Sequence, residues 1–160
     1  MIGRRLLVAG IGNVFFGDDG FGVEVVRRLG ARPLPDDVRV MDVGIRGLDL
    51  AYALLDGYAA AVLVDATPRG GAPGTLYVLD PQTSGVRETL VDPHALEPRR
   101  MLDLVQAMGG RLPVLRIVGC EPARAMGEGQ MSVGLSAPVA AAVEGAVILV
   151  ESLVTELRNP

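Results

Sequence analysis

The sequence predicts an α/β fold, namely a single domain with a twisted, mostly parallel five-stranded sheet and helices on both faces. Short apolar runs alternate along the chain with segments whose apolar residues recur at helical spacing, which is the order typical of such sheets. The 160 residues suffice for one domain with a sizeable core, and no linker, internal repeat or low-complexity tract divides them. We therefore expect residues 1–160 to form one domain.

Five apolar runs bounded by turn residues predict the strands. They are residues 6–9, 38–43, 60–64, 75–79 and 113–118. The third and fourth runs are joined by a Pro/Gly-rich turn, residues 66–74, which is too short for a helical crossover. This favours an antiparallel pairing of the third and fourth strands, and an antiparallel edge strand is common in such sheets.

Four segments in which apolar residues recur at helical spacing predict the helices. They are residues 23–29, 48–55, 96–108 and 139–157. Residues 80–93 and 121–132 are predicted to be long loops, which in a compact domain are often functional.

Charge and cysteine content exclude several classes of protein. The formal net charge is −4, and the 15 basic residues are dispersed, so we do not expect nucleic acid as a partner. All of them are arginine, which excludes a lysine Schiff base and a standard P-loop. Cys120 is the only cysteine, so no intrachain disulfide can form and a reducing compartment is expected.

The apolar segments of the chain do not predict a membrane protein. The longest apolar region, residues 133–154, is interrupted by Glu144 and Glu151. The apolar stretch behind Arg4 and Arg5 shows no convincing small-residue cleavage site. We therefore expect a cytoplasmic protein without a membrane span.

A glycine turn and a pair of acids follow the first predicted strand. Gly10 and Gly12 begin like a dinucleotide-binding fingerprint, but Phe15 stands where the next glycine is required. Asp18 and Asp19 would also repel a phosphate in this turn. The loop therefore favours a site that uses its carboxylate side chains over a site that binds phosphate.

Asp65 follows the third apolar run, so in a parallel sheet its carboxylate lies at the same edge as the acids of the first loop. If the first and third strands are neighbours, their backbones are about 4.8 Å apart, which lets two carboxylates share a cation or a proton. Alternatively, Asp65 caps the turn that follows it.

His94 is the only histidine, so any site that needs an imidazole must use it. Two carboxylates and one imidazole would make a mixed oxygen and nitrogen site suited to a divalent first-row metal, with positions open for a substrate. The alternative is a structural or solvated histidine. Cys120 could pair with His94 as a nucleophile, although inert buried cysteines are common at strand ends.

Several short motifs occur in a fixed order along nearly the whole chain. They are Gly12-Asn13, Gly17-Asp18-Asp19-Gly20-Phe21-Gly22, Asp65-Ala66, Pro73-Gly74-Thr75, Pro93-His94, Val118-Gly119-Cys120-Glu121-Pro122 and Ser132-Val133-Gly134-Leu135-Ser136. With these motifs the chain resembles the hydrogenase maturation proteases, which are cytoplasmic endopeptidases grouped as aspartic-type. They remove a C-terminal extension from the precursor of the large subunit of nickel-iron hydrogenase.

The resemblance implies a metal-binding triad and a protein substrate. By motif position the metal ligands are Asp19, Asp65 and His94, which are also the candidate catalytic residues. The implied metal is nickel already inserted into the precursor, so the substrate would complete the coordination shell. The resemblance also implies a monomer.

The same resemblance implies a role for each of two loops. The residues expected to shape the turn that carries Asp19 are Gly10, Gly12, Asn13, Gly20 and Gly22. The loop after the second strand is associated with substrate selection, and its residues of interest are Asp42, Gly44, Arg46 and Gly47. Many family members have Asp-Gly-Gly-Thr/Ser there, so this chain departs from the family pattern at the segment that selects the precursor.

The sequence leaves the mechanism and two other functions open. Either the metal polarises the carbonyl or a water molecule, or Asp19 or a neighbouring carboxylate acts as general base on water. One alternative function is a non-enzymatic nickel-binding accessory protein that uses the same triad. A second is a nucleotide-binding module in which Asp42 binds the ribose.

Overall fold

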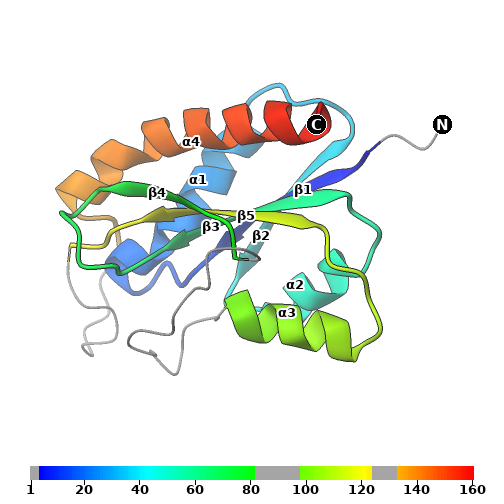
Figure 1. Cartoon of the computed structure of the whole chain (residues 1–160). Helices are drawn as coiled ribbons and strands as arrows, with labels where there is room; N and C mark the ends of the chain where they lie inside the picture. The colour runs from blue at the N-terminus through cyan, green and yellow to red at the C-terminus, as the bar shows by residue number, and fades with distance from the viewer. Residues whose placement is uncertain (1–3, 82–97, 124–132) are drawn as a thin grey trace.

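The computed structural model describes residues 4–81, 98–123 and 133–160. Their strands form one sheet in the order β2-β1-β3-β5-β4 (Figure 1). The strands are β1 (Leu6–Ile11), β2 (Val38–Gly44), β3 (Ala60–Ala66), β4 (Leu76–Leu79) and β5 (Val114–Cys120). Each coincides with one of the predicted apolar runs to within two residues at either end, which confirms the predicted strands.

The strand that pairs with β4 differs from the predicted one. β1 pairs in parallel with β2 and β3, β3 pairs in parallel with β5, and β4 runs antiparallel to β5. The expectation that the third and fourth strands pair with each other was therefore wrong, although β4 is an antiparallel edge strand. The connection from β3 passes over the end of β5, where the Glu121 N–H donates to the Thr75 carbonyl at 2.9 Å. As a result β5 lies between β3 and β4.

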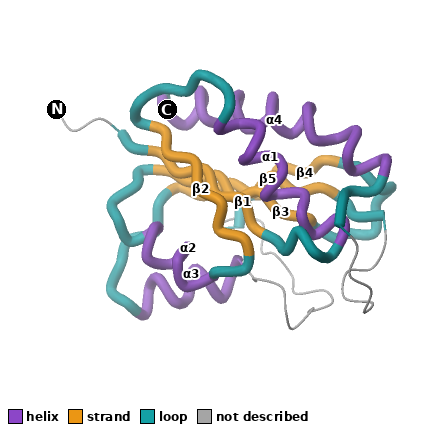
Figure 2. Tube along the Cα trace, turned by 180° about the vertical axis from the view of Figure 1, so that it is seen from behind, coloured by secondary structure: helices purple, strands orange, loops and turns teal. Residues whose placement is uncertain are grey.

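Helices cover both faces of the sheet, as predicted. Figures 1 and 2 show α1 (Phe21–Gly30) and α4 (Ala137–Arg158) on one face, with α2 (Gly47–Leu54) and α3 (Pro98–Ala107) on the other. Residues 96 and 97 of the predicted third helix lie outside the described residues. A short 3-10 helix, η1 (Gly17–Gly20), leads directly into α1.

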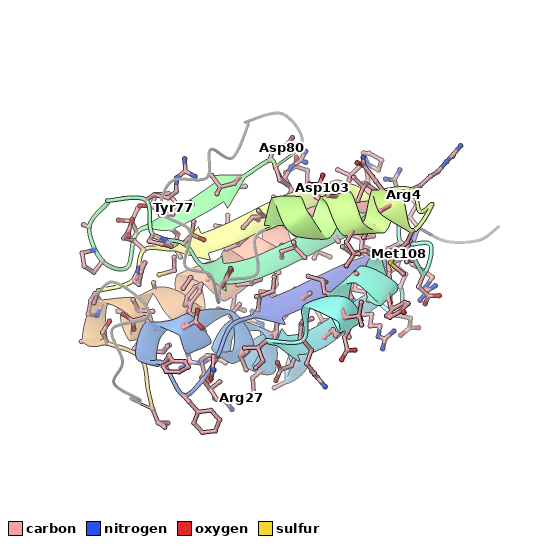
Figure 3. All side chains as sticks on the ribbon, turned by 90° about the horizontal axis from the view of Figure 1, so that it is seen from below. Arg4, Arg27, Tyr77, Asp80, Asp103 and Met108 are labelled. Carbon is pink, nitrogen blue, oxygen red and sulfur yellow. The ribbon has the colours of Figure 1, made fainter. Side chains whose placement is uncertain are left out.

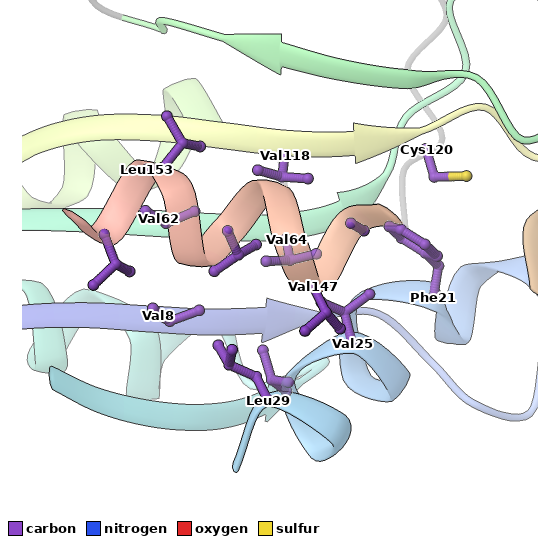
Figure 4. Close-up of a cluster of buried hydrophobic side chains, with 14 of the residues drawn as sticks. Val8, Phe21, Val25, Leu29, Val62, Val64, Val118, Cys120, Val147 and Leu153 are labelled. Carbon is purple, nitrogen blue, oxygen red and sulfur yellow. The ribbon is translucent and has the colours of Figure 1, made fainter. Parts of the chain in front are cut away.

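The two hydrophobic cores follow from the alternation of side chains along the strands. Leu6 and Val8 of β1 belong to the core under α1 and α4, whereas Leu7 and Ala9 belong to the core under α2 and α3. Figure 4 shows the first of these cores, in which Phe21 at the start of α1 is fully buried. Burial of such a side chain contributes about 1.5–3 kcal/mol, so it fixes the start of α1 against the sheet.

α4 is the one helix, within the part of the chain described above, that is long and apolar enough to cross a membrane. Its apolar side lies in the core of the domain, where Val143, Val147 and Val150 are fully buried. On its polar side, Glu144 and Glu151 form ion pairs with Arg32 at 3.3 and 2.9 Å. These contacts are those of a core helix.

Candidate active site

The loop after β1 depends on close backbone approaches that only glycine allows. Gly12 has a φ of 134°, and a Cβ atom at this position would lie 1.8 Å from the Asp19 carbonyl oxygen. A Cβ at Gly22 would lie 2.1 Å from the Val64 carbonyl oxygen of β3. The two glycines let η1 and the start of α1 rest directly on the carboxyl ends of β1 and β3.

Asp19 lies in η1 at the edge of the sheet where the parallel strands end, which we call the carboxyl edge. Its Oδ2 accepts a hydrogen bond of 2.9 Å from the Asn13 N–H. The side chain of Asn13 in turn accepts a hydrogen bond of 3.0 Å from the Phe15 N–H. Asn13 therefore shapes the loop and orients the Asp19 carboxylate within it.

Asp65 lies near the end of β3, one residue beyond the Val64 that pairs with Gly10 of β1. Burial raises the pKa of Asp65 well above its usual 3.8, and the negative charge of Asp19 raises it further, while the Ala66 backbone lowers it. The two carboxyl groups therefore interact across the junction of β1 and β3. Such a pair is suited to sharing a proton or binding a cation.

Asp18 makes contacts that differ from those of its neighbour Asp19. Its Oδ1 accepts a 2.7 Å hydrogen bond from the Ser136 N–H. Its Oδ2 accepts 2.8 Å hydrogen bonds from the Ser136 hydroxyl and from the Ala123 N–H. Asp18 therefore connects η1 to the segment that follows β5 and to the start of α4.

His94, the third predicted ligand, lies outside the described residues. Among residues 4–81, 98–123 and 133–160 no group of three His, Cys, Asp or Glu side chains is arranged to hold a metal ion. The structure thus brings Asp19 and Asp65 together, and the participation of His94 stays a prediction.

Cys120 is unsuited to act as a nucleophile. The thiol is buried at the end of β5. Burial raises its pKa to about 11, with further contributions from the charges of Asp18 and Glu121. At neutral pH the side chain is a thiol that belongs to the same hydrophobic core as Phe21 (Figure 4).

Glu121 organises the connection between β3 and β4 from a buried position. Its Oε1 accepts hydrogen bonds of 2.8 Å from the N–H groups of Arg69 and Gly71, and one of 2.7 Å from the Tyr77 hydroxyl. Tyr77 lies on β4 at the margin of the sheet (Figure 3). Burial acts to raise the pKa of Glu121, but these hydrogen bonds outweigh it and lower the pKa.

The loop between β2 and α2 lies beside the first loop. The Gly12 N–H donates to the Gly44 carbonyl at 2.9 Å, and Gly44 has a φ of 57°. Arg46 donates to the carbonyls of Asp42 and Val43 at 2.7 and 3.2 Å, so its guanidinium stabilises the loop itself. Gly47, the last of the predicted selection residues, is the first residue of α2.

Sequence reasoning missed the apolar side chains that these two loops expose. Ile45 is 67% exposed on the second loop, and Leu48, in the first turn of α2 that follows this loop, is 56% exposed. Phe15 and Phe16 are also exposed on the first loop. For Phe15, Phe16 and Ile45 the signal in the sequence was the position of large apolar residues between turn glycines, whereas Leu48 begins the predicted helix of residues 48–55.

Ser136 was also missed as a contact of the first loop. It stands before Ala137 and Pro138 at the N-cap of α4, where a serine normally caps the helix. In the structure it makes no side-chain capping bond, and its hydroxyl donates to Asp18 instead. The sequence pattern identified the helix start but not the distant partner.

Comparison with known proteins assigns this arrangement to a family. The family described as hydrogenase maturation protease matches residues 23–153. The chain belongs to the hydrogenase maturation protease family. The protease is accordingly a peptidase, which confirms the predicted family and enzyme class.

Individual relatives agree with this assignment. A protein of Methanocaldococcus jannaschii that carries the family's name is 32% identical to the protease, over 92% of this chain and 94% of its own length. HupD of Rhodobacter capsulatus, a hydrogenase expression/formation protein, is 34% identical over 74% of this chain, which spans 58% of HupD. The solved structure of the hydrogenase maturating endopeptidase HybD from Escherichia coli superposes with a TM-score of 0.80 at 29% identity. That match covers 96% of this chain and 93% of HybD, and it confirms the predicted fold class.

Proposed function

We propose that the protease removes the C-terminal extension of a nickel-iron hydrogenase large-subunit precursor, after nickel has been inserted. The observation that carries this proposal is the interacting pair Asp19 and Asp65 at the carboxyl edge of the sheet, in a chain of this family. Ligand sites of open α/β sheets lie at this edge.

In this proposal the nickel belongs to the substrate and serves as the recognition element. Asp19, Asp65 and His94 would supply two carboxylate oxygens and one imidazole nitrogen, a donor set that suits a divalent first-row metal. A cation between the two carboxyl groups would also offset the repulsion that raises the pKa of Asp65. Binding at the metal would place the scissile peptide bond beside the same carboxyl groups.

The hydrolytic step requires an activated water molecule, and the acid pair offers a base for it. Burial and the charge of Asp19 raise the pKa of Asp65, so Asp65 binds a proton more readily than an ordinary aspartate as long as no cation is present. Asp19 or a neighbouring carboxylate can accept a proton from water as general base. Polarisation of the carbonyl or water by the nickel is the other route open to the same residues.

The precursor would dock across the two loops at the carboxyl edge. Ile45 on the second loop and Leu48 in the first turn of α2 are exposed, and the second loop is joined to the first by the hydrogen bond from Gly12 to Gly44. Burial of their exposed apolar surface by the precursor would contribute to binding. In this proposal Asp42, Gly44, Arg46 and Gly47 determine the shape of the loop that presents these side chains.

We further propose that the protease acts as a monomer in the cytoplasm. In support, the apolar side of α4 is occupied within the domain's own core. The only cysteine of the chain is buried and free, as a reducing compartment allows.

The decisive experiment is incubation of the purified protease with nickel-loaded large-subunit precursor, followed by mass measurement of the product. Loss of a C-terminal peptide is expected with the wild type and not with Asp65→Ala, His94→Ala or nickel-free precursor. An intact precursor together with tight nickel binding would instead favour the non-enzymatic accessory function. Cleavage of nickel-free precursor at the same rate would contradict recognition of nickel.

A further inference from the structure

Asp18 links three segments of the chain at the carboxyl edge. It lies in η1, and its two carboxylate oxygens accept hydrogen bonds from Ala123, three residues after the end of β5, and from Ser136 at the start of α4. These partners are 105 and 118 residues away in the sequence. We propose that Asp18 is a positioning residue that holds η1 in place, so that the adjacent Asp19 carboxylate stays directed toward Asp65. This inference rests on the function proposed above.

The geometry of η1 explains how one acid can act through the other. In a 3-10 helix successive side chains are rotated by about 120°, so adjacent residues point in different directions. Asp18 is directed to Ser136 and Ala123, whereas Asp19 accepts a hydrogen bond from Asn13 and interacts with Asp65. A rotation of η1 that releases Asp18 from its partners therefore moves Asp19 as well.

The donors around Asp18 require a carboxylate. Both oxygens are used, and two of the three donors are backbone N–H groups, which cannot reverse to accept a hydrogen bond. An amide in place of the carboxylate presents its NH₂ to one of these N–H groups, whichever way it is turned. Asp18→Asn therefore keeps the size of the side chain but breaks at least one link between η1 and the neighbouring segments.

The test compares Asp18→Asn with a matched acid-to-amide control. Asp37 also links distant parts of the chain, because its carboxylate accepts a 3.1 Å hydrogen bond from Arg158 at the end of α4. Asp37→Asn therefore loosens a tertiary contact of α4 without touching the first loop. Ser136→Ala removes the hydroxyl but keeps the N–H, and Ser136→Thr restores a hydroxyl.

Four quantities are measured for each variant: kcat and KM for nickel-loaded precursor, the affinity of the free protease for Ni²⁺ by calorimetry, and the thermal midpoint. For Asp18→Asn we expect kcat to fall about 10- to 100-fold, because a displacement of a catalytic group by about 1 Å has an effect of this size. The Ni²⁺ affinity should fall with it, while KM changes less. Ser136→Ala should show a smaller loss that Ser136→Thr recovers, and Asp37→Asn should keep the wild-type kcat and Ni²⁺ affinity.

Wild-type kcat and Ni²⁺ affinity in Asp18→Asn would overturn the positioning role. So would an equal loss of kcat in Asp37→Asn at the same fall in thermal midpoint, because the effect would then be one of overall stability. If Asp18→Asn does not fold, Ser136→Ala decides the question by the same two readouts. A wild type that binds Ni²⁺ but leaves the precursor intact contradicts the proposed function alone, and the Ni²⁺ affinities of the variants still test Asp18.

Discussion

Asp65 on β3 and Asp19 in η1 form an interacting acid pair in which burial, and then the charge of Asp19, raises the pKa of Asp65. The pair exists because β1 and β3 are parallel neighbours, and because Gly12 and Gly22 let η1 lie against the ends of both strands. A carboxyl group with a strongly shifted pKa at the edge of an α/β sheet is a mark of a functional site. The same repulsion makes the site a source of instability for the folded protein.

The first prediction is that Asp65→Asn stabilises the metal-free protease at neutral pH while abolishing processing. The folded protein binds the Asp65 proton more tightly than the unfolded chain, since its pKa is raised above 3.8. As pH rises above that value the unfolded chain ionises first, so the free energy of unfolding of the wild type falls until the folded group also ionises. The asparagine variant does not undergo this loss.

Thermal denaturation from pH 3 to 8 checks this prediction. The thermal midpoint of Asp65→Asn should exceed that of the wild type at pH 7, and the two should converge below the usual pKa of 3.8. Asp56→Asn serves as the control, because its carboxylate is 63% exposed. A midpoint of Asp65→Asn below that of the wild type at pH 7 would contradict the repulsive pair.

The second prediction is that Gly12→Ala destabilises the protein and stops processing. The added Cβ meets the Asp19 carbonyl oxygen at 1.8 Å, and the φ of 134° is strained for alanine. Such strain and overpacking cost about 1–3 kcal/mol, and relief of the clash displaces Asp19. Gly30→Ala is the matched control, because no atom lies within 4 Å of a Cβ there. Urea denaturation should place Gly30→Ala at or above the wild type, and equal activity of both variants would refute the role of Gly12.

The third prediction is that Glu121→Gln lowers the free energy of unfolding by about 1–3 kcal/mol at pH 7. The substitution replaces a charged acceptor by a neutral one, and hydrogen bonds to a neutral acceptor are weaker. The pKa of Glu121 is lowered in the folded state, so its stabilisation is present above the usual value of 4.5 and is lost as pH falls through the folded-state pKa. The difference between variant and wild type should therefore shrink below pH 4.5. Glu144→Gln, at an exposed position on α4, should stay within about 0.5 kcal/mol of the wild type at all pH values. A difference for Glu121→Gln that does not vary with pH would contradict the ionised state of Glu121.

The elements of this fold could be predicted from apolar periodicity, but the strand order could not. The run at residues 75–79 carries the pattern of a strand, and its short connection to the third strand favoured direct pairing. The structure places β5 between them, because residues after Asp65 pass over the end of β5 and bond to Glu121. Such a route depends on tertiary contacts between Thr75 and Glu121 that no local pattern encodes.

In the candidate site, too, features that depend on the local sequence could be predicted, and contacts between distant residues could not. The position of Asp65 after an apolar run was sufficient to place it at the carboxyl edge beside Asp19. The partners of Asp18 were not readable, because Ala123 and Ser136 lie more than 100 residues away in the sequence. The loop that carries Arg46 was expected to select the substrate, and the sequence did not reveal that the Arg46 guanidinium bonds to carbonyls of the same loop.

The last prediction concerns substrate docking by the exposed side chains of the second loop and of the first turn of α2. Ile45→Ser and Leu48→Ser should each raise KM for the precursor about five- to tenfold, because further burial of a partly exposed apolar side chain of this size contributes about 1–1.4 kcal/mol. Thermal midpoints should not change, since Ile45 is 67% exposed and Leu48 is 56% exposed in the free protein. Ile148→Ser is the matched control, because Ile148 is 57% exposed on α4, which covers the face of the sheet opposite to α2 (Figures 1 and 2). A rise in KM for Ile148→Ser equal to that for Ile45→Ser would show that the precursor docks elsewhere.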